Sequence, residues 1–197
     1  RIIGGKLRGG RIAYTGEPGT RPMKERVREA IFNLIGPAIR GSHAIDVFAG
    51  TGALGLEALS RGAAAATFVE RHLPTAKTLQ ENMHALGVAD RSQLFKSDTF
   101  FWMREVPSAL RTSSDDGSQA ELPWVVFCSP PYALYHERTD DMLTLIDCFM
   151  QHAPADSTIA VEADTDFDFA QLPLANQWDV RTYSPAVVGL WRSDLGQ

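Results

Sequence analysis

Short apolar runs alternate with longer amphipathic segments along most of the chain. From residue 43 onward, short apolar runs are followed by segments whose apolar residues recur every three or four positions, the spacing of one helix face. Such alternation is typical of a mostly parallel sheet covered by helices on both faces. The pattern predicts strands over residues 43–48, 66–70, 93–96, 124–128, 158–163, 179–183 and 187–192, and helices over residues 53–60, 75–86, 99–110 and 140–152.

The first 40 residues are glycine-rich and basic and lack this alternation. They predict a short strand over Leu7–Tyr14 and a turn at residues 16–19. A helix is predicted to open at Arg21-Pro22, because proline is tolerated in the first turn of a helix. The sequence therefore predicts two parts, a small strand-and-helix extension over residues 1–40 and a main domain over residues 41–197.

The main domain is expected to be a doubly wound α/β fold of the Rossmann-like kind. Its seven predicted strands would form a mostly parallel sheet, closed by an antiparallel hairpin around Ser184-Pro185. The chain has 197 residues, 44% hydrophobic and 22% charged, which is enough for one well-buried domain. This composition excludes a disordered chain, a collagen-like repeat and a disulfide-stapled mini-domain.

Cysteine, histidine and apolar content bear on the compartment. Cys128 and Cys148 each lie in an apolar stretch and are expected to be buried, reduced thiols. No apolar run approaches the roughly 20 residues of a membrane span, and no signal-peptide pattern opens the chain. The histidines show no metal-binding spacing with cysteine or acidic residues. We therefore expect a cytoplasmic protein, by default a monomer, without a metal or a membrane partner.

Charge is distributed unevenly along the chain. Residues 1–28 hold eight Lys and Arg against two Glu, whereas the whole chain has a net charge of −5. An acidic protein with a basic N-terminal segment indicates a local contact with a polyanion rather than a general coat for nucleic acid. A merely solvated basic loop is the alternative.

Chemistry-bearing residues follow the predicted strands, at the edge where ligands bind in open α/β sheets. The first strand leads into a glycine-rich loop between Asp46 and Gly55, and glycines allow a backbone to pass close to a ligand. Asp46 would meet a cationic amino-acid tail or anchor the loop. Glu70 ends the second strand and suits ribose hydroxyls. Asp98 follows the third strand, where it would accept a bond from an adenine amino group or cap the next helix.

The glycine pattern by itself leaves the ligand class open. Gly50, Gly52 and Gly55 fit G-x-G-x-x-G, which also describes a dinucleotide site or a purely structural turn. Two features favour an adenosyl ligand without a pyrophosphate. The Asp46 carboxylate would repel phosphate, and the Ser-Pro-Pro-Tyr segment at 129–132, after the fourth predicted strand, has no evident role in hydride transfer.

The chain resembles class I S-adenosylmethionine-dependent methyltransferases, and more narrowly the RsmD-type family, which methylates a guanine N2 amino group in 16S ribosomal RNA. The resemblance covers nearly the whole chain, and its two N-terminal motifs are specific, whereas the glycine loop is shared with many methyltransferases. The family normally has Asp or Asn before Pro-Pro, where this chain has Ser129. The matching segments are residues 1–9 (RIIGGKLRG), 21–29 (RPMKERVRE), 46–63 (DVFAGTGALGLEALSRGA), 68–70 (FVE) and 130–132 (PPY).

The resemblance implies S-adenosylmethionine as cofactor and methyl transfer to the amine of a base that is flipped into the site. It also implies a ribosomal RNA substrate, either naked or in an assembled small-subunit particle. Ser129 leaves alternatives open, namely cytosine N4 or adenine N6 in RNA or DNA, or an RNA-binding relative without turnover; an NAD oxidoreductase is more distant. The expected residues are Ser129, Pro130, Pro131 and Tyr132 for catalysis, Asp46, Phe48, Gly50, Thr51, Gly52, Glu70, Arg71, Asp98 and Thr99 for the cofactor, and Arg8, Arg11, Arg21, Lys24 and Arg28 for RNA.

Overall fold

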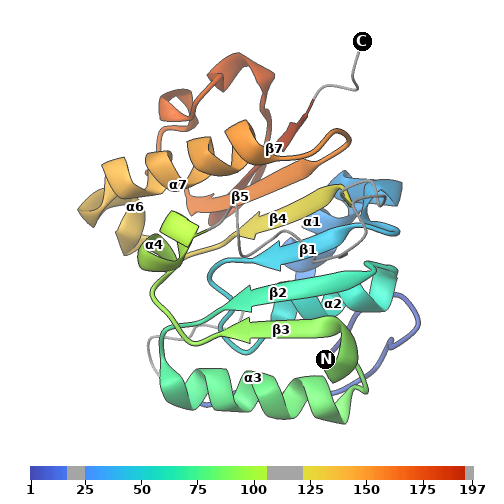
Figure 1. The fold of residues 1–197 in the computed structure, drawn as a ribbon. Helices are drawn as coiled ribbons and strands as arrows, with labels where there is room; N and C mark the ends of the chain where they lie inside the picture. The colour runs from blue at the N-terminus through green and yellow to red at the C-terminus, as the bar shows by residue number, and fades with distance from the viewer. Residues whose placement is uncertain (17–24, 106–121, 194–197) are drawn as a thin grey trace.

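The computed structural model describes residues 1–16, 25–105 and 122–193, and a single seven-stranded sheet runs through it (Figure 1). The strand order is β3-β2-β1-β4-β5-β7-β6. The five strands from β3 to β5 are parallel, and β7 pairs antiparallel with both β5 and β6. The predicted fold is therefore confirmed. The strands are β1 His43–Asp46, β2 Ala65–Val69, β3 Ser92–Phe95, β4 Trp124–Cys128, β5 Thr158–Asp164, β6 Asp179–Tyr183 and β7 Ala186–Arg192.

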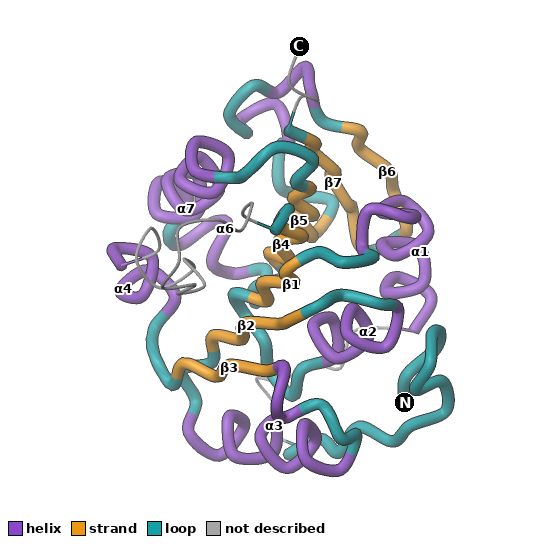
Figure 2. The backbone as a smooth tube through the Cα atoms, turned by 45° about the vertical axis from the view of Figure 1, so that its right-hand side comes forward, coloured by secondary structure: helices purple, strands orange, loops and turns teal. Residues whose placement is uncertain are grey.

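Helices cover both faces of the sheet (Figure 2). Alternate residues of a strand point to opposite faces, so Val125 and Phe127 of β4 pack with α1, α2 and α3, whereas Val126 and Cys128 pack with α4, α6 and α7. The sheet thus separates two apolar cores. The helices are α1 Glu25–Ile35, α2 Ala53–Arg61, α3 Leu73–Ala85, α4 Thr99–Trp102, α6 Ala133–Glu137 and α7 Thr139–His152, with short 3₁₀ turns at 36–39, 89–91, 103–105, 169–171 and 175–177.

The strand predicted over Leu7–Tyr14 is wrong. Residues 1–16 form turns and irregular structure that pack against α2 and α3. Side chains of those helices satisfy the backbone: Ile3 N–H donates to Glu57 (2.8 Å), and Ala13 N–H donates to Asn82 (2.8 Å). No partner strand is needed when acceptors of this kind are already in place.

Other predicted boundaries differ in smaller ways. Of the helix expected over residues 99–110, the structure describes residues 99–105, which form one α-helical turn, α4, and a 3₁₀ turn to Glu105; residues 106–110 lie outside the described residues. The short helix α6 was not predicted. The predicted helix start at Arg21, most of the turn at 16–19 and nearly all of the predicted loop at 112–122 lie outside the described residues.

A buried ion pair ties the N-terminal segment and α1 to α2. Glu57 is fully buried, and its carboxylate accepts from Gly4 N–H (2.7 Å) and from Arg61 Nε (2.8 Å). The Arg28 guanidinium lies beside it, with 3.7 Å between Arg28 Nε and Glu57 Oε2, and its Nη2 donates to the Arg1 carbonyl. These contacts fix the first turn of α1 at the edge of the sheet where β7 begins.

Candidate active site

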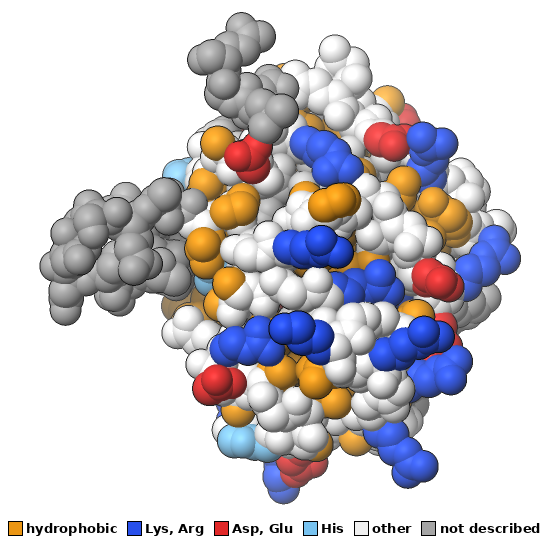
Figure 3. Space-filling model, turned by 90° about the vertical axis from the view of Figure 1, so that its right-hand side faces the viewer, with side chains coloured by type: hydrophobic (Ala, Val, Ile, Leu, Met, Phe, Trp, Pro, Cys, Tyr) orange, Lys and Arg blue, Asp and Glu red, His pale blue; other side chains and the backbone are white. Residues whose placement is uncertain are grey.

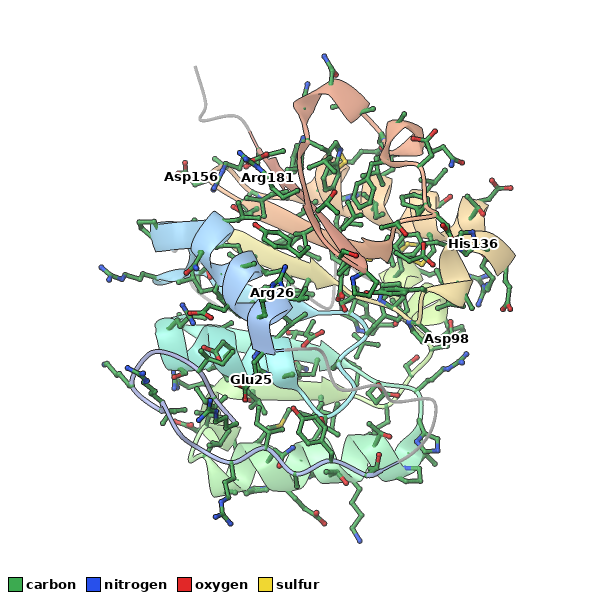
Figure 4. The ribbon with its side chains drawn as sticks, turned by 180° about the vertical axis from the view of Figure 1, so that it is seen from behind. Glu25, Arg26, Asp98, His136, Asp156 and Arg181 are labelled. Atoms are coloured by element: carbon green, nitrogen blue, oxygen red, sulfur yellow. The ribbon has the colours of Figure 1, made fainter. Side chains whose placement is uncertain are left out.

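One cavity of about 480 Å³ lies where the parallel strands end. Its volume falls in the range of small-ligand sites. In the sheet order, β1 and β4 are neighbours whose connecting segments leave in opposite directions, which creates a crevice at their carboxyl ends. Figure 4 labels Asp98 and His136 at this edge and Asp156 and Arg181 toward the opposite edge. Residues from β1, β2, β4 and β5 thus converge on one space.

Asp46 lies at the end of β1 and is 1% exposed. Its Oδ2 accepts from Gly55 N–H of α2 at 3.0 Å, so the side chain does anchor the glycine loop. Its Oδ1 is buried and has no hydrogen-bond partner in the part of the chain that the structure describes. Burial raises the pKa of Asp46 to about 7, and the nearby Glu70 carboxylate adds to the rise. Because Asp46 lines the cavity, this buried acceptor oxygen is a candidate to accept a hydrogen bond from a ligand there.

The glycine loop is held by the end of β2. Glu70 Oε2 accepts from Gly50 N–H (2.8 Å), and its Oε1 accepts from His72 N–H (2.7 Å). Gly52 begins α2 with φ of +91°, and a Cβ there would lie 2.3 Å from Leu79 Cδ1. Only glycine fits this position without strain. The loop is therefore held in one conformation, with Gly50 and Thr51 lining the cavity.

Asp98 caps helix α4, as one of its two predicted roles requires, and only its Oδ1 takes part in the cap. Its Oδ1 accepts from Phe100 N–H (2.9 Å) and Phe101 N–H (3.2 Å). Its Oδ2 lies 3.9 Å from Arg71 Nη1, and both residues line the cavity. The hydroxyl of Thr99 donates to the Val47 carbonyl, which ties α4 to the end of β1.

The turn after β4 forms the other wall. Ser129 Oγ donates to Glu162 Oε2, and the Tyr132 hydroxyl donates to Glu162 Oε1 at 2.8 Å. Pro130 is buried and Pro131 is exposed. Because the prolines have no N–H groups, the turn presents carbonyl and hydroxyl oxygens rather than amide donors.

Most of the expected cofactor and catalytic residues meet at this cavity. Gly52 is the exception, because it supports the loop from behind and does not line the space. Glu162 was not predicted, although it is the sole charged residue in the predicted strand over residues 158–163, which is an unusual place for a carboxylate. The expected residues that line the cavity are Asp46, Phe48, Gly50, Thr51, Glu70, Arg71, Asp98, Thr99, Ser129, Pro130, Pro131 and Tyr132.

The expected RNA-binding residues differ in their exposure to solvent. Arg28 is not available to RNA: its side chain is 1% exposed and pairs with Glu57. Its neighbour Arg26 is exposed in the first turn of α1, beside Val27, which lines the cavity. Arg8 and Arg11 are exposed. Arg21 and Lys24 lie outside the described residues.

Further cations gather at the edge where the parallel strands begin, which Figure 3 views face on. Arg91 Nη1 donates to the Ala63 carbonyl (3.1 Å), and Arg192 Nη2 donates to the Leu34 carbonyl (2.8 Å).

Across residues 1–16, 25–105 and 122–193, no cluster of three or more His, Cys, Asp or Glu could hold a metal ion. Within the same ranges, no helix is long and apolar enough to cross a bilayer.

The sheet order, the glycine loop after β1 and the proline turn after β4 together define the class I methyltransferase fold. Residues 1–188 match the family model described as conserved hypothetical protein 95. The chain belongs to that family, and the RsmD-type resemblance is confirmed.

Individual relatives support the assignment over different lengths. The chain is 32% identical to YlbH of Bacillus subtilis (strain 168) over 171 residues. This aligned region covers 87% of this chain and 86% of that protein. The chain is 48% identical over 86 residues to Ribosomal RNA small subunit methyltransferase D of Escherichia coli (strain K12), covering 44% of this chain and 43% of that protein. The solved Escherichia coli protein yhhF matches with a TM-score of 0.73 and 27% identity over 98% of both chains.

Proposed function

We propose that the protein is an S-adenosylmethionine-dependent methyltransferase that acts on the N2 amine of a guanine in ribosomal RNA of the small subunit. The observation that carries this proposal is the shared cavity. The glycine loop with Asp46 and Glu70 forms one side of it, and the turn at residues 129–132 forms the other. A methyl donor and an acceptor base would therefore meet inside one enclosed space. The match to a ribosomal RNA small subunit methyltransferase supports the substrate class.

The residues present fit S-adenosylmethionine, which when bound supplies an electrophilic methyl group on a sulfonium. The buried, unpartnered Asp46 Oδ1 suits the ammonium of its amino-acid part. Glu70 keeps further lone pairs for ribose hydroxyls, since each carboxylate oxygen can accept two hydrogen bonds. Asp98 would receive the adenine amino group on Oδ2, because Oδ1 is used by the helix cap.

The turn at 129–132 would hold and activate the amine. The lone pair of an exocyclic amine is delocalised into the base, so attack requires the nitrogen to pyramidalise. Ser129 Oγ and the Pro130 carbonyl would accept the amine hydrogens and aim the lone pair. The Tyr132 ring would stack on the flipped base. After the new N–C bond forms, the amine releases its proton to solvent, so no strong base is required.

The negative charge of Glu162 favours guanine among the candidate bases. Guanine carries an N1–H donor next to its N2 amine, whereas adenine and cytosine carry a ring-nitrogen acceptor next to theirs. A carboxylate accepts hydrogen bonds and repels acceptors. With Glu162 lining the cavity 2.8 Å from the Tyr132 hydroxyl, a guanine edge is the complementary partner.

Substitutions in the turn test this site. We expect Ser129→Ala to lower kcat roughly tenfold, because one positioned hydrogen bond worth about 1.4 kcal/mol is lost. Tyr132→Ala should raise KM for RNA roughly tenfold through lost stacking, worth about 1–3 kcal/mol. Single-turnover and steady-state assays with labelled methyl donor measure both. Unchanged rates in both variants would show that the amine is bound elsewhere.

RNA affinity depends on exposed cations near the cavity mouth and in the basic extension, residues 1–40. We expect Arg26→Ala to weaken RNA binding and to reduce the slope of log affinity against log salt by roughly 0.7–0.9, as for one lost phosphate contact. Fluorescence anisotropy at several salt concentrations measures the slope. Asn33→Ala on the same helix is the matched exposed control. An Arg26 variant with the wild-type slope would exclude a phosphate contact there.

A further inference from the structure

Glu162 connects the two polar side chains of the turn after β4. It lies on β5 and is 7% exposed, and one carboxylate oxygen accepts from Ser129 while the other accepts from Tyr132. Strand pairing explains the contact: Cys128 and Val161 are register partners on the parallel strands β4 and β5, so the next residue on each strand emerges at the same place. The arrangement is therefore built into the sheet.

The carboxylate determines where the Ser129 proton lies. A hydroxyl has one hydrogen and two lone pairs, so alone it can either donate to an amine or accept from it. An ionised carboxylate only accepts, so the Ser129 hydrogen must point to Glu162. Ser129 Oγ then presents lone pairs to the cavity. Hydrogen bonds to ionised partners are also stronger and hold their geometry better than neutral ones.

We propose that Glu162 is a positioning residue for methyl transfer: by holding the Ser129 hydroxyl hydrogen, it makes Ser129 Oγ a fixed acceptor for an N–H of the target amine. This inference rests on the proposed function. Glu162 acts through Ser129, and its contact with the Tyr132 hydroxyl orients the ring that stacks on the base. In the transfer step the amine nitrogen bonds to the methyl carbon, the sulfur–carbon bond breaks, and the sulfur leaves as a neutral thioether.

A double-mutant cycle between Ser129 and Glu162 tests the inference. Glu162→Leu removes the acceptor at similar side-chain length, and we expect kcat to fall roughly tenfold, as for Ser129→Ala. Because the two residues act as one unit, Ser129→Ala with Glu162→Leu should be no slower than either single variant. The dissociation constant for S-adenosylhomocysteine should stay within about twofold of wild type. Additive losses, or no loss in Glu162→Leu, would overturn the inference.

Moving the carboxylate from position 162 to position 129 gives a second test, because a purely structural role of Glu162 predicts no recovery of activity. Ser129→Asp combined with Glu162→Leu places an acceptor directly at the amine, and we expect kcat to recover at least fivefold over Glu162→Leu alone, an effect of about 1 kcal/mol. Ser129→Asp alone should be slower than this double variant, since two carboxylates would then share the site. Absence of rescue would contradict the proposed positioning.

Asp164→Asn is the matched control. Asp164 lies on the same strand, but its carboxylate contacts His136 (3.4 Å) and Phe167 N–H (3.2 Å), and Asp164 is not among the residues that line the cavity. Its kcat should match wild type. If Glu162→Leu fails to bind S-adenosylhomocysteine, the same cycle is run with Glu162→Met, which also lacks the oxygen acceptor and is closer to glutamate in length. Wild-type protein that transfers no methyl group would remove the proposed function itself, whereas an active wild type with an additive cycle removes only this inference.

Discussion

We expect Asp46→Asn to lower the affinity for S-adenosylhomocysteine by roughly a hundredfold or more, because removing one member of a buried charge pair costs about 2–5 kcal/mol. The amide keeps the shape of the side chain, and its oxygen can still accept from Gly55 N–H, so the glycine loop stays anchored. What is lost is the charge on the buried Oδ1 that would meet the ammonium. Isothermal titration calorimetry measures the loss.

The pH dependence of binding separates charge from shape. Burial raises the pKa of Asp46 to about 7, so the ligand-free carboxylate is protonated below that pH. An ammonium binds the ionised form, so affinity should fall roughly tenfold per pH unit below 7 in wild type. It should be nearly flat between pH 6 and 8 in Asp46→Asn. A wild-type affinity independent of pH, or an Asp46→Asn variant that binds normally, would show that the ammonium lies elsewhere.

The same shift has a consequence for stability. A carboxyl group whose folded pKa lies above its unfolded value stabilises the fold at low pH, and this contribution is lost as pH rises through the folded pKa. For Asp46 the loss begins near the ordinary pKa of 3.8 and is complete near pH 7. Bound S-adenosylhomocysteine should therefore raise the melting temperature more at pH 8 than at pH 6.

We expect Glu57→Gln to destabilise the protein by about 3–5 kcal/mol, the usual cost of leaving one partner of a buried ion pair uncompensated. The substituted amide still fits between α1, α2 and the N-terminal segment. It leaves the buried Arg28 guanidinium beside a neutral group, and it can no longer accept from both Ile3 N–H and Gly4 N–H. Urea denaturation measures the change.

An exposed carboxylate provides the control for Glu57. Glu25 pairs with Arg1 at 3.0 Å on the surface, where both side chains are about half exposed or more. Exposed ion pairs contribute little, so Glu25→Gln should leave the urea midpoint nearly unchanged. Equal midpoints for Glu57→Gln and wild type would mean that the buried pair does not hold the N-terminal segment in place.

The apolar runs were enough to predict the central strands, because burial on both faces makes strands such as β4 and β5 almost continuously apolar. It failed for Leu7–Tyr14, where the acceptors that satisfy the backbone come from Glu57 and Asn82, far along the chain. Contacts between residues so far apart in sequence produce no pattern of apolar and polar positions within a short segment. The segment packs against the helix after the glycine loop, where Leu7 N–H donates to Ser60 Oγ.

Two single charged residues lie among apolar residues in the sequence, and each proves to be buried in the fold. Arg28 lies three, four and seven positions before Ile31, Phe32 and Ile35, which places it on the buried face of α1 rather than on its flank. Glu162 interrupts an apolar strand and proves to contact Ser129. In both cases the partner is distant in sequence, so the chain alone shows that a charge is buried but not what it pairs with.

We propose that the protein transfers a methyl group to a guanine amine bound in this cavity. The most direct test incubates the protein with labelled S-adenosylmethionine and small-subunit ribosomal RNA from a strain that lacks the modification, as naked RNA and as assembled particles. The RNA is then digested to nucleosides for mass analysis. Label in N2-methylguanosine, formed much more slowly with Ser129→Ala and Tyr132→Ala combined, is the expected result. Label in N4-methylcytidine or N6-methyladenosine, or none despite measured cofactor binding, would contradict it.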